Sequence, residues 1–532
     1  MSHSPAGAAR RKLLLLAALP ALLIAIAPIV YLVARATAGG GLQSLEASTI
    51  GPATIRTFVL AILVAVGAVG IGVPLAVLTI RTDLPLRRVA LVLGALPLVI
   101  PSYVGALALL GALGPRGLLA QALEPLGVFR LPTIDGLLGS TIVLVLFTYP
   151  YVLLLTAAAL RRVDPALEQA ARGMGRGSLD TFVRVTLPQI RSAVIAGALL
   201  AALYAMSDFG VVSLLRCTTL TREAFLRYDA LYDPAGAAAV GLVLAALALL
   251  MVGAEQWTVR GSTIAARRRV RAREATTPLE LRRTARLGAS AFVVTIISLA
   301  LILPLAILIW WALTLIGDAS LLSQLVDALP AAANAIGVSS AAAIVCLVLA
   351  LPVAALVTRS SGRLPRWIES VSYVGYALPG IVVGLGLVFF AIRTAPFLYQ
   401  TVALVVLAYV VRLLPQAISG ARSGWERVDP RFEQAARGMG RSASGTLFRV
   451  TLPLAAPGVL TGAALVVLTA IKELPATLLL RPNGFETPAT IIWQKTNVAE
   501  YSSAAIPALL LIAISAIPVY FLLIRPEARP RP

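Results

Sequence analysis

The sequence contains very few of the residues that build metal sites and acid–base catalytic centres. Its 532 residues include one histidine, His3, and two cysteines, Cys217 and Cys346, which lie far apart and outside any motif. A cysteine-based metal site, a disulfide framework and a histidine general base are therefore not expected. The sequence also lacks a Gly-x-x-x-x-Gly-Lys-Ser/Thr loop, the usual phosphate cradle of an ATPase. We expect the chain to bind no cofactor or metal and to hydrolyse no ATP itself.

Charged residues are also scarce. They make up 13% of the chain, against about a quarter in an average soluble domain, whereas 59% of the residues are hydrophobic. So much apolar surface cannot be buried in a soluble fold of this size, and membrane lipid is the expected solvent for much of it. The net charge of +21 does not indicate a nucleic-acid partner, because the basic residues lie in short segments between apolar runs.

A helix needs about 20 apolar residues to cross a bilayer, and the sequence contains about twelve such runs. An all-α membrane protein with about 12 transmembrane helices is therefore predicted. Several runs contain Pro or Gly, which membrane helices tolerate. The runs lie near residues 13–34, 56–80, 89–113, 137–160, 192–215, 235–258, 290–316, 335–358, 371–393, 400–420, 457–480 and 503–524.

Arginine and lysine are concentrated in alternate loops, which are expected to lie in the cytoplasm. Examples are the segments 161–191 and 267–286, whereas acids balance the basic residues in the loop near 114–136. Both termini of this multi-pass protein of the cell membrane are therefore placed in the cytoplasm. The first run could instead be a cleaved signal peptide, but it exceeds the roughly 7–15 residues of a signal core. A retained helix is favoured, since a matching run opens the second half.

The sequence is an internal duplication. Arg162 to Pro188 reads RVDPALEQAARGMGRGSLDTFVRVTLP, and Arg427 to Pro453 reads RVDPRFEQAARGMGRSASGTLFRVTLP. The two segments align without a gap, and 19 of their 27 positions are identical. A repeat of this kind indicates two copies of one structural unit. Ala95-Leu96-Pro97 is matched with Ala377-Leu378-Pro379 as a second landmark. We divide the chain into a first half (1–258), a basic cytoplasmic linker (259–289) and a second half (290–532), with each half expected to hold six spans in parallel orientation.

Each copy of the repeated loop is predicted to contain a short helix. Asp164-Pro165 and Asp429-Pro430 have the residue types of a helix N-cap and first turn, and glycines at 173, 175, 438 and 440 are expected to end the helices. The small residues between these ends would allow another protein to approach closely. An ordinary amphipathic interfacial loop would explain one copy, but it does not explain why two copies stay nearly identical while the flanking runs differ.

The repeated loop resembles the cytoplasmic motif of binding-protein-dependent ABC importer permeases, in which Glu-Ala-Ala is followed by Gly and, after nine residues, by a β-branched residue, any residue and Leu-Pro. The inserted Gln169 and Gln434 are a mild departure from that pattern. The matching residues are Glu168, Ala170, Ala171, Gly175, Val185, Leu187 and Pro188, and then Glu433, Ala435, Ala436, Gly440, Val450, Leu452 and Pro453.

The resemblance implies two tandem six-helix type I ABC importer permease (MetI-like) halves, in which these loops couple the chain to an ATPase. It also implies two copies of an ABC ATPase subunit, which use the ATP, and an extracytoplasmic solute-binding protein, expected on outer loops near 215–234 and 481–502. One rival is a secondary transporter with parallel repeats, which would leave the docking loops unexplained. A membrane enzyme would need a catalytic set that the sequence does not offer.

Ionisable residues inside predicted spans are candidates for the translocation path. Asp208 lies in the fifth run, Lys472 and Glu473 lie in the eleventh, and the register of the repeated loops places Asp208 opposite Glu473. In a structural reading, Glu473 pairs with Lys472 or Arg412, and Asp208 bonds to polar neighbours. In a functional reading, both acids line the path. Tyr149, with Tyr103 and Tyr151, is a further candidate for the path, although tyrosines near span ends often anchor a protein at the interface.

The segments 207–210 and 472–490 resemble the fused permeases of ferric-iron uptake systems, and the similarity extends over nearly the whole chain. Paired carboxylates would suit a hard cation such as ferric iron, because such ions prefer oxygen ligands. Fused permeases for thiamine or aminoethylphosphonate look alike at this level, and cargo choice rests largely with the external binding protein. Ferric iron is therefore the favoured cargo, with another small solute as the alternative.

Overall fold

The computed structural model describes residues 5–520, apart from residues 39, 42, 44, 46, 116, 267–279, 318–320 and 361. Regular secondary structure in this part of the chain is helical. Eleven of the described helices are long and apolar enough to span a membrane, and a bent pair brings the number to twelve. The prediction of an all-α membrane protein with about 12 spans is therefore confirmed.

The six spans of the first half are built from seven α-helices, because the third span is broken. They are α1 (Pro5–Ala38), α2 (Ala47–Arg81), α3 (Arg87–Ala95) with α4 (Ser102–Leu113), α6 (Gly136–Leu160), α9 (Leu187–Ser207) and α12 (Pro234–Ala266). The second half repeats the pattern. Its spans are α13 (Arg283–Ile297) with α14 (Leu303–Gly317), α15 (Leu321–Arg359), α16 (Arg363–Ser372) and α17 (Val374–Ala377) with α18 (Gly380–Thr394), α19 (Val402–Glu426), α22 (Leu452–Ala470) and α25 (Ala505–Val519).

The third span of each half is broken at a proline, which the continuous apolar runs did not predict. Pro101 and Pro379 are both extended and directly precede the helices α4 and α18, and the second break bends the chain by 101°. Proline disfavours helical backbone in the residue before it. Pro379 therefore corresponds to Pro101, and the sequence-based match of Pro97 with Pro379 was wrong.

The fifth and eleventh spans begin and end earlier than predicted. Short π-helical segments, η3 (Phe182–Thr186) and η6 (Leu447–Thr451), continue directly into α9 and α22. These helices end at Ser207 and Ala470, and the chain then turns before the short helices α10 (Gly210–Leu214) and α23 (Pro475–Leu480). Asp208, Lys472 and Glu473 therefore lie on breaks after the spans and not inside them, which corrects the predicted ranges 192–215 and 457–480.

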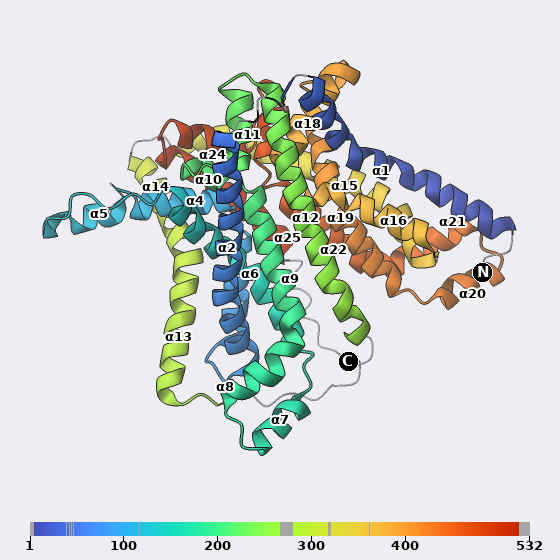
Figure 1. Ribbon diagram of the computed structural model, residues 1–532, viewed down its shortest axis with the longest axis horizontal. Helices are drawn as coiled ribbons and strands as arrows, with labels where there is room; N and C mark the ends of the chain where they lie inside the picture. The colour runs from blue at the N-terminus through green and yellow to red at the C-terminus, as the bar shows by residue number, and fades with distance from the viewer. Residues whose placement is uncertain are drawn as a thin grey trace.

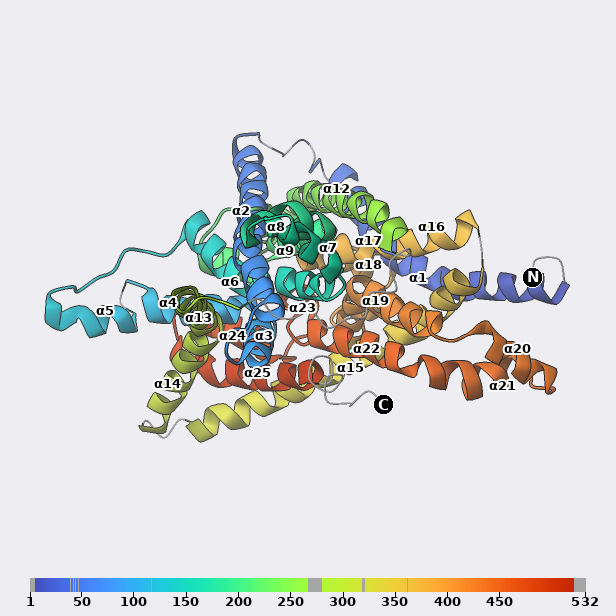
Figure 2. The same cartoon turned by 90° about the horizontal axis from the view of Figure 1, so that it is seen from below.

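Each half places its first span against the other half. In the first half α2, α6 and α9 pack together, and in the second half α15, α19 and α22 do so. Helix α1 packs on α15 and α18 of the second half, whereas α13 and α14 pack on α2, α3 and α4 of the first. Figures 1 and 2 show α1 lying apart from α2 and beside the second half. This exchange ties the two halves into one body.

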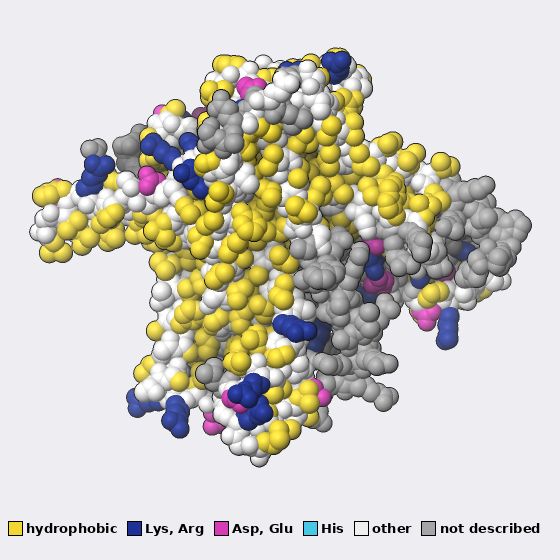
Figure 3. All heavy atoms as spheres, viewed as in Figure 1, with side chains coloured by type: hydrophobic (Ala, Val, Ile, Leu, Met, Phe, Trp, Pro, Cys, Tyr) yellow, Lys and Arg dark blue, Asp and Glu magenta, His cyan; other side chains and the backbone are white. Residues whose placement is uncertain are grey.

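The outer faces of the spans are apolar, as expected of a surface in contact with lipid. Large hydrophobic side chains such as Phe58, Val66, Val294 and Trp310 are exposed, and Figure 3 shows hydrophobic side chains covering the middle of the molecule. Basic side chains lie at the lower end of this view, where Figure 1 places α7 and α8, and also at its upper left and top. This arrangement matches a band of lipid-facing surface between two charged ends.

The predicted linker (259–289) is helical at both of its ends. Helix α12 continues to Ala266 and α13 begins at Arg283, while residues 267–279 lie outside the described part of the chain. The end of the linker is attached to the first half, because the Leu281 N–H donates to Asp83 Oδ1 at 2.9 Å and Arg286 forms an ion pair with the same carboxylate. The Leu281 hydrogen bond lowers the pKa of Asp83 below its usual value.

Candidate coupling loops and translocation cavity

The repeated loops form the predicted short helices, α7 (Pro165–Gly173) and α20 (Pro430–Gly438). Their N-caps are as expected, since Asp164 accepts a hydrogen bond from the N–H of Ala166, and Asp429 from that of Arg431, both at 2.9 Å. Each helix is followed by a residue with left-handed backbone, Gly175 (φ 84°) or its counterpart Gly440 (φ 82°). Glycine adopts this conformation at little cost, and it ends each helix sharply.

Helix α7 presents an apolar stripe to the outside. Leu167, Ala170 and Met174 follow the spacing i, i+3, i+7, which places them on one face of a helix, and all three are exposed. The equivalent stripe on α20 consists of Phe432, Ala435 and Met439. Only the small residues of the loops were predicted from the sequence to face a partner, although the spacing of these larger residues could have revealed them. We call these sets the first and second apolar stripes.

The inner face of each helix packs against the chain's own spans. Ala171 and Ala436 are each only 3% exposed, so the expectation that they offer room to a partner was wrong for these two residues. Ala170 and Ala435 are on the exposed face, and an added Cβ at Gly175 or Gly440 would meet nothing within 4 Å. The space for a partner therefore lies on the stripe side and beyond the C-terminal ends of the helices.

The glutamate of the first loop also points inward. Glu168 Oε1 accepts a hydrogen bond from Thr186 Oγ1 at 2.7 Å and lies 3.4 Å from Nη2 of Arg81. The same Nη2 donates to the carbonyl oxygen of Leu160 at 3.1 Å. The Glu168 side chain is only 12% exposed. We call Arg81, Glu168 and Thr186 the first Arg–Glu–Thr cluster.

The second loop repeats this arrangement. Glu433 Oε1 accepts from Nη2 of Arg359 and from Oγ1 of Thr451, both at 3.1 Å. Arg359 Nη2 also donates to the carbonyl oxygen of Val428 at 3.0 Å, and the Glu433 side chain is 9% exposed. We call Arg359, Glu433 and Thr451 the second Arg–Glu–Thr cluster. The contacts of the two arginines with these glutamates were not predicted, because both arginines lie far upstream of the glutamates and outside the repeated motif.

The Leu-Pro pairs of the motif form the first residues of the long helices α9 and α22. Leu187-Pro188 and Leu452-Pro453 directly follow the π-helical segments η3 and η6. Proline inside a helix lacks an N–H, and its ring conflicts with the carbonyl group four residues earlier. The wider π turn before each proline relieves that conflict. It also contains the threonine that binds the glutamate of its cluster.

A cavity of about 360 Å³ lies between the halves, and all the path candidates named from the sequence except Tyr149 line it. The first half contributes Asp208, Ser102 and three tyrosines, and the second half contributes Arg412, Lys472 and Glu473. Tyr149 does not line the cavity and is fully buried, so its prediction was wrong. Tyr151 lies two positions further along the same helix. Because successive helical residues are about 100° apart, Tyr149 and Tyr151 point to nearly opposite sides of α6, and Tyr151 faces the cavity. The three lining tyrosines of the first half are Tyr103, Tyr151 and Tyr204.

Both acidic residues at the cavity are engaged by their own chain. Asp208 accepts hydrogen bonds from Ser102 Oγ at 2.6 Å and from the N–H of Val211 at 2.8 Å. Glu473 forms an ion pair with Arg412 and accepts a long hydrogen bond from the N–H of Ala476 at 3.4 Å. In each half the acid therefore bonds to the residue three positions ahead, in the short helix after the break.

Lys472 does not pair with Glu473. Its Nζ atom donates to the carbonyl oxygen of Leu98 at 2.7 Å, next to the break in the third span of the first half. The ammonium group therefore connects the two halves across the cavity. Leu98 and Pro101 both line the cavity, so its walls include breaks in the spans that the sequence did not predict.

Comparison with known proteins identifies this architecture. The family described as "binding-protein-dependent transport system inner membrane component" matches residues 68–262 and 347–525, one segment in each half. The chain belongs to this permease family. It is therefore a multi-pass inner-membrane transport protein, made of two family units in tandem.

Several characterised permeases are similar to the chain. A Fe(3+)-transport system permease protein, FbpB 2 of Haemophilus influenzae, is 30% identical over 504 residues, covering 93% of this chain and 94% of that protein. The thiamine permease ThiP of Brucella suis is 29% identical over 364 residues, which is 67% of this chain and 65% of ThiP. The molybdenum permease ModB of Mycobacterium tuberculosis is 32% identical over 189 residues, which is 34% of this chain and 69% of ModB.

The cavity of this permease contains two acidic and two basic side chains, and both acids are already bonded. Within the described residues, no group of three or more His, Cys, Asp or Glu side chains could hold a metal ion. The contacts therefore match the structural reading of Asp208 and Glu473. They remove the support that paired carboxylates gave to a hard cation as cargo.

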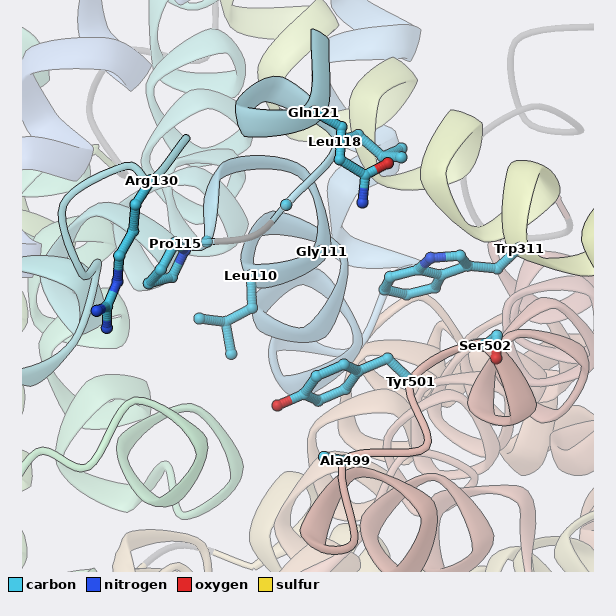
Figure 4. A pocket seen from close by; sticks show the side chains of 12 residues that line it. Leu110, Gly111, Pro115, Leu118, Gln121, Arg130, Trp311, Ala499, Tyr501 and Ser502 are labelled. Atoms are coloured by element: carbon cyan, nitrogen blue, oxygen red, sulfur yellow. The ribbon is translucent and has the colours of Figure 1, made fainter. Parts of the chain in front are cut away.

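A second and larger pocket, of about 550 Å³, lies on the permease away from the coupling loops. Figure 4 shows Trp311 and Tyr501 on one side of it and Arg130 on the other. The rings of Trp311 and Tyr501 are stacked, with centroids 6.4 Å apart. The pocket is therefore lined by the long loop of the first half (114–136), by α14 and by the residues that precede α25.

The two loops expected to meet a solute-binding protein lie side by side. They contain α11 (Leu220–Asp229) and α24 (Pro488–Asn497), which Figure 1 places at the end of the molecule away from α7. Phe209 lies between them, with its ring centroid 4.7 Å from that of Phe225 and 4.9 Å from that of Trp493. This aromatic contact connects the break after α9 to both loops.

Proposed function

We propose that this permease is the membrane subunit of an ATP-driven importer and that ferric iron is its cargo. In this proposal a separate ATPase subunit binds each coupling helix, and an external solute-binding protein delivers the cargo to the opposite side. Both chain termini lie on the ATPase side, in the cytoplasm. The observation that carries the proposal is the duplicated coupling helix with its exposed apolar stripe in a permease of the binding-protein-dependent family.

The apolar stripes are suited to docking because a soluble partner can bury them. An amphipathic helix that lays its apolar face into a groove is a common mode of recognition. The side chains at the ends of the first stripe, Leu167 and Met174, are 49% and 73% exposed. When ATP draws two ATPase subunits together, helices seated in their grooves move with them. The two halves then rock about their common axis and open the cavity first to one side and then to the other.

Overall similarity is the support for iron as the cargo. The ferric-iron permease of Haemophilus influenzae aligns with 93% of the chain, whereas the thiamine permease aligns with 67%. The cavity itself does not select one cargo, since basic, acidic and phenolic groups all line it. Thiamine, molybdate and 2-aminoethylphosphonate are the competing cargoes, because permeases named for these solutes or for molybdenum are also similar.

The proposal is tested by uptake of labelled solutes into cells that express the permease together with the ATPase and the binding protein of its own transport system. Ferric iron should accumulate, and accumulation should stop when the ATPase is inactivated. Cells without the permease provide the baseline. Accumulation of thiamine, molybdate or 2-aminoethylphosphonate in place of iron would contradict the assignment of cargo and leave the assignment as an ATP-driven permease intact.

A further inference from the structure

The two Arg–Glu–Thr clusters connect each coupling helix to the ends of transmembrane spans. In the first cluster Arg81 is the last residue of α2, its carbonyl partner Leu160 is the last residue of α6, and Thr186 lies in the π segment before α9. Glu168 of α7 therefore meets the end of α2 and the segment before α9, and its partner Arg81 also binds the end of α6. The contacts enclose the inner side of the coupling helix.

The second cluster is built in a similar way, except that its carbonyl group belongs to Val428, in the loop between α19 and α20, and not to the last residue of a span. Arg359 is the last residue of α15, Val428 follows the end of α19, and Thr451 lies in the π segment before α22. In both clusters one guanidinium nitrogen, Nη2, faces both the carbonyl oxygen and the glutamate oxygen. The geometry thus occurs twice, although the register that aligns the two loop motifs does not align Arg359 with Arg81.

Because the two Arg–Glu pairs are buried, separating the glutamate from the arginine is energetically unfavourable. The Arg81 and Arg359 side chains are 7% and 16% exposed, so water screens the charge pairs poorly. A buried charge that loses its partner is strongly unfavourable. The glutamate and the arginine therefore resist separation, and a displacement of the coupling helix is transmitted to the ends of the spans. The exposed apolar stripe on the other face of the helix remains available to the ATPase.

We propose that Arg81 and Arg359 are positioning residues that join the coupling helices rigidly to the transmembrane spans. The glutamate of the loop motif then acts inside the permease, as the attachment point of the helix. Without the arginines the ATPase still docks on the apolar stripes and still hydrolyses ATP, but the helix moves without moving the spans. This proposal rests on the ATPase docking proposed above.

The test measures transported cargo and hydrolysed ATP together in proteoliposomes that contain the permease, its ATPase and its binding protein. The double variant Arg81→Ala/Arg359→Ala should retain ATPase co-purification and basal ATP hydrolysis, while cargo transported per ATP falls at least about tenfold. Arg81→Lys/Arg359→Lys, which keeps the charge, should recover part of the ratio. Arg88→Ala is the matched control, because Arg88 lies in the first turn of α3 and is exposed.

A charge exchange separates positioning from general stability. Glu168→Arg and Arg81→Glu should each uncouple transport from hydrolysis, and the two together should restore the ratio above that of either single variant. An unchanged ratio in the alanine double variant, or equal loss of assembly, hydrolysis and transport in every variant without rescue, would overturn the proposal. If the unmodified permease binds no ATPase, the docking proposal has failed and not this one.

Hydrogen exchange on the permease alone checks the attachment without any partner. Arg81→Ala should increase backbone exchange in α7, which loses its tie, and should leave exchange in the middle of α2 unchanged. Arg88→Ala should change neither. Equal exchange in α7 with and without Arg81 would show that the cluster does not hold the helix.

Discussion

At the scale of single residues, the acids beside the cavity each accept a hydrogen bond from the first turn of the short helix that follows. Asp208 and Glu473 bond to backbone N–H groups of Val211 and Ala476, three residues ahead in each case. The register of the repeated loops predicted that the two positions are equivalent, and the contacts agree with that prediction. The sequence could not show the bonds themselves, because it placed both acids inside continuous helices.

Asp208 should contribute to stability mainly through its two hydrogen bonds. Asp208→Ala removes the acceptor for Ser102 Oγ and for the Val211 N–H, and leaving a buried donor without its acceptor costs about 1–3 kcal/mol. We expect a lower thermal unfolding temperature in detergent and reduced uptake. Asp208→Asn keeps one acceptor oxygen and should lose less stability. Equal unfolding temperatures for the alanine variant and the unmodified protein would show that these two hydrogen bonds do not stabilise the fold.

Removing only Arg412 from its ion pair with Glu473 should reduce the free energy of unfolding far more than removing both charges together. Arg412→Leu leaves a carboxylate that is 8% exposed without its partner, and breaking a buried pair in this way costs about 3–5 kcal/mol. Arg412→Leu with Glu473→Gln removes both charges and should recover most of the lost stability. The measurement is thermal unfolding of the two variants, and equal losses in both would show that the pair is not coupled.

Gly175 and Gly440 are constrained by backbone conformation and not by space. Replacing either with Ala forces a side chain into the left-handed region at a cost of about 1 kcal/mol, which should shift the end of the coupling helix and weaken ATPase co-purification. Gly173→Ala is the control, since an added Cβ there also meets nothing within 4 Å and no positive φ applies. Membrane insertion should be normal in all three variants. Co-purification equal to that of the Gly173→Ala control would show that the left-handed turn does not shape the docking surface.

At the scale of helices, the apolar runs predicted the number of spans but not their breaks. Composition remains apolar across Pro101 and Pro379, so hydropathy carries no signal for these two breaks. The turns after α9 and α22 contain the charged residues Asp208, Lys472 and Glu473, but the long apolar runs around them led to both being read as continuous spans. The duplicated loops were predicted best, because their caps and glycines are local features. The two arginines of the Arg–Glu–Thr clusters could not be predicted, since they reach their partners only through the packing of distant spans.

The apolar stripes should determine whether an ATPase binds. Leu167→Asp with Phe432→Asp places a charge at the start of each stripe, and desolvating an unpaired carboxylate is costly. We expect ATPase co-purification to be lost while the permease still inserts in the membrane. The matched control changes Gln169 and Gln434 to Glu, because these residues are exposed but lie outside the stripes. ATPase binding that persists in the stripe variant would place the docking surface elsewhere.

At the scale of the whole molecule, the exchange of first spans joins the two halves, and the cavity lies between them. Lys472 reaches across to Leu98, and the aromatic contacts of Phe209 connect one wall of the cavity to the loops on the far side. The coupling helices, the cavity and these loops thus form one continuous structure. None of these long-range contacts was predictable from the sequence, which showed only that the same unit occurs twice.

The most direct test of the account is solute uptake by purified permease in liposomes, with and without its ATPase and binding protein. We predict that uphill uptake requires ATP, the ATPase and the binding protein, and that an ion gradient alone supports none. Concentrative uptake by the permease alone, driven by an ion gradient, would contradict the central claim that the work is done in a separate subunit and enters through α7 and α20.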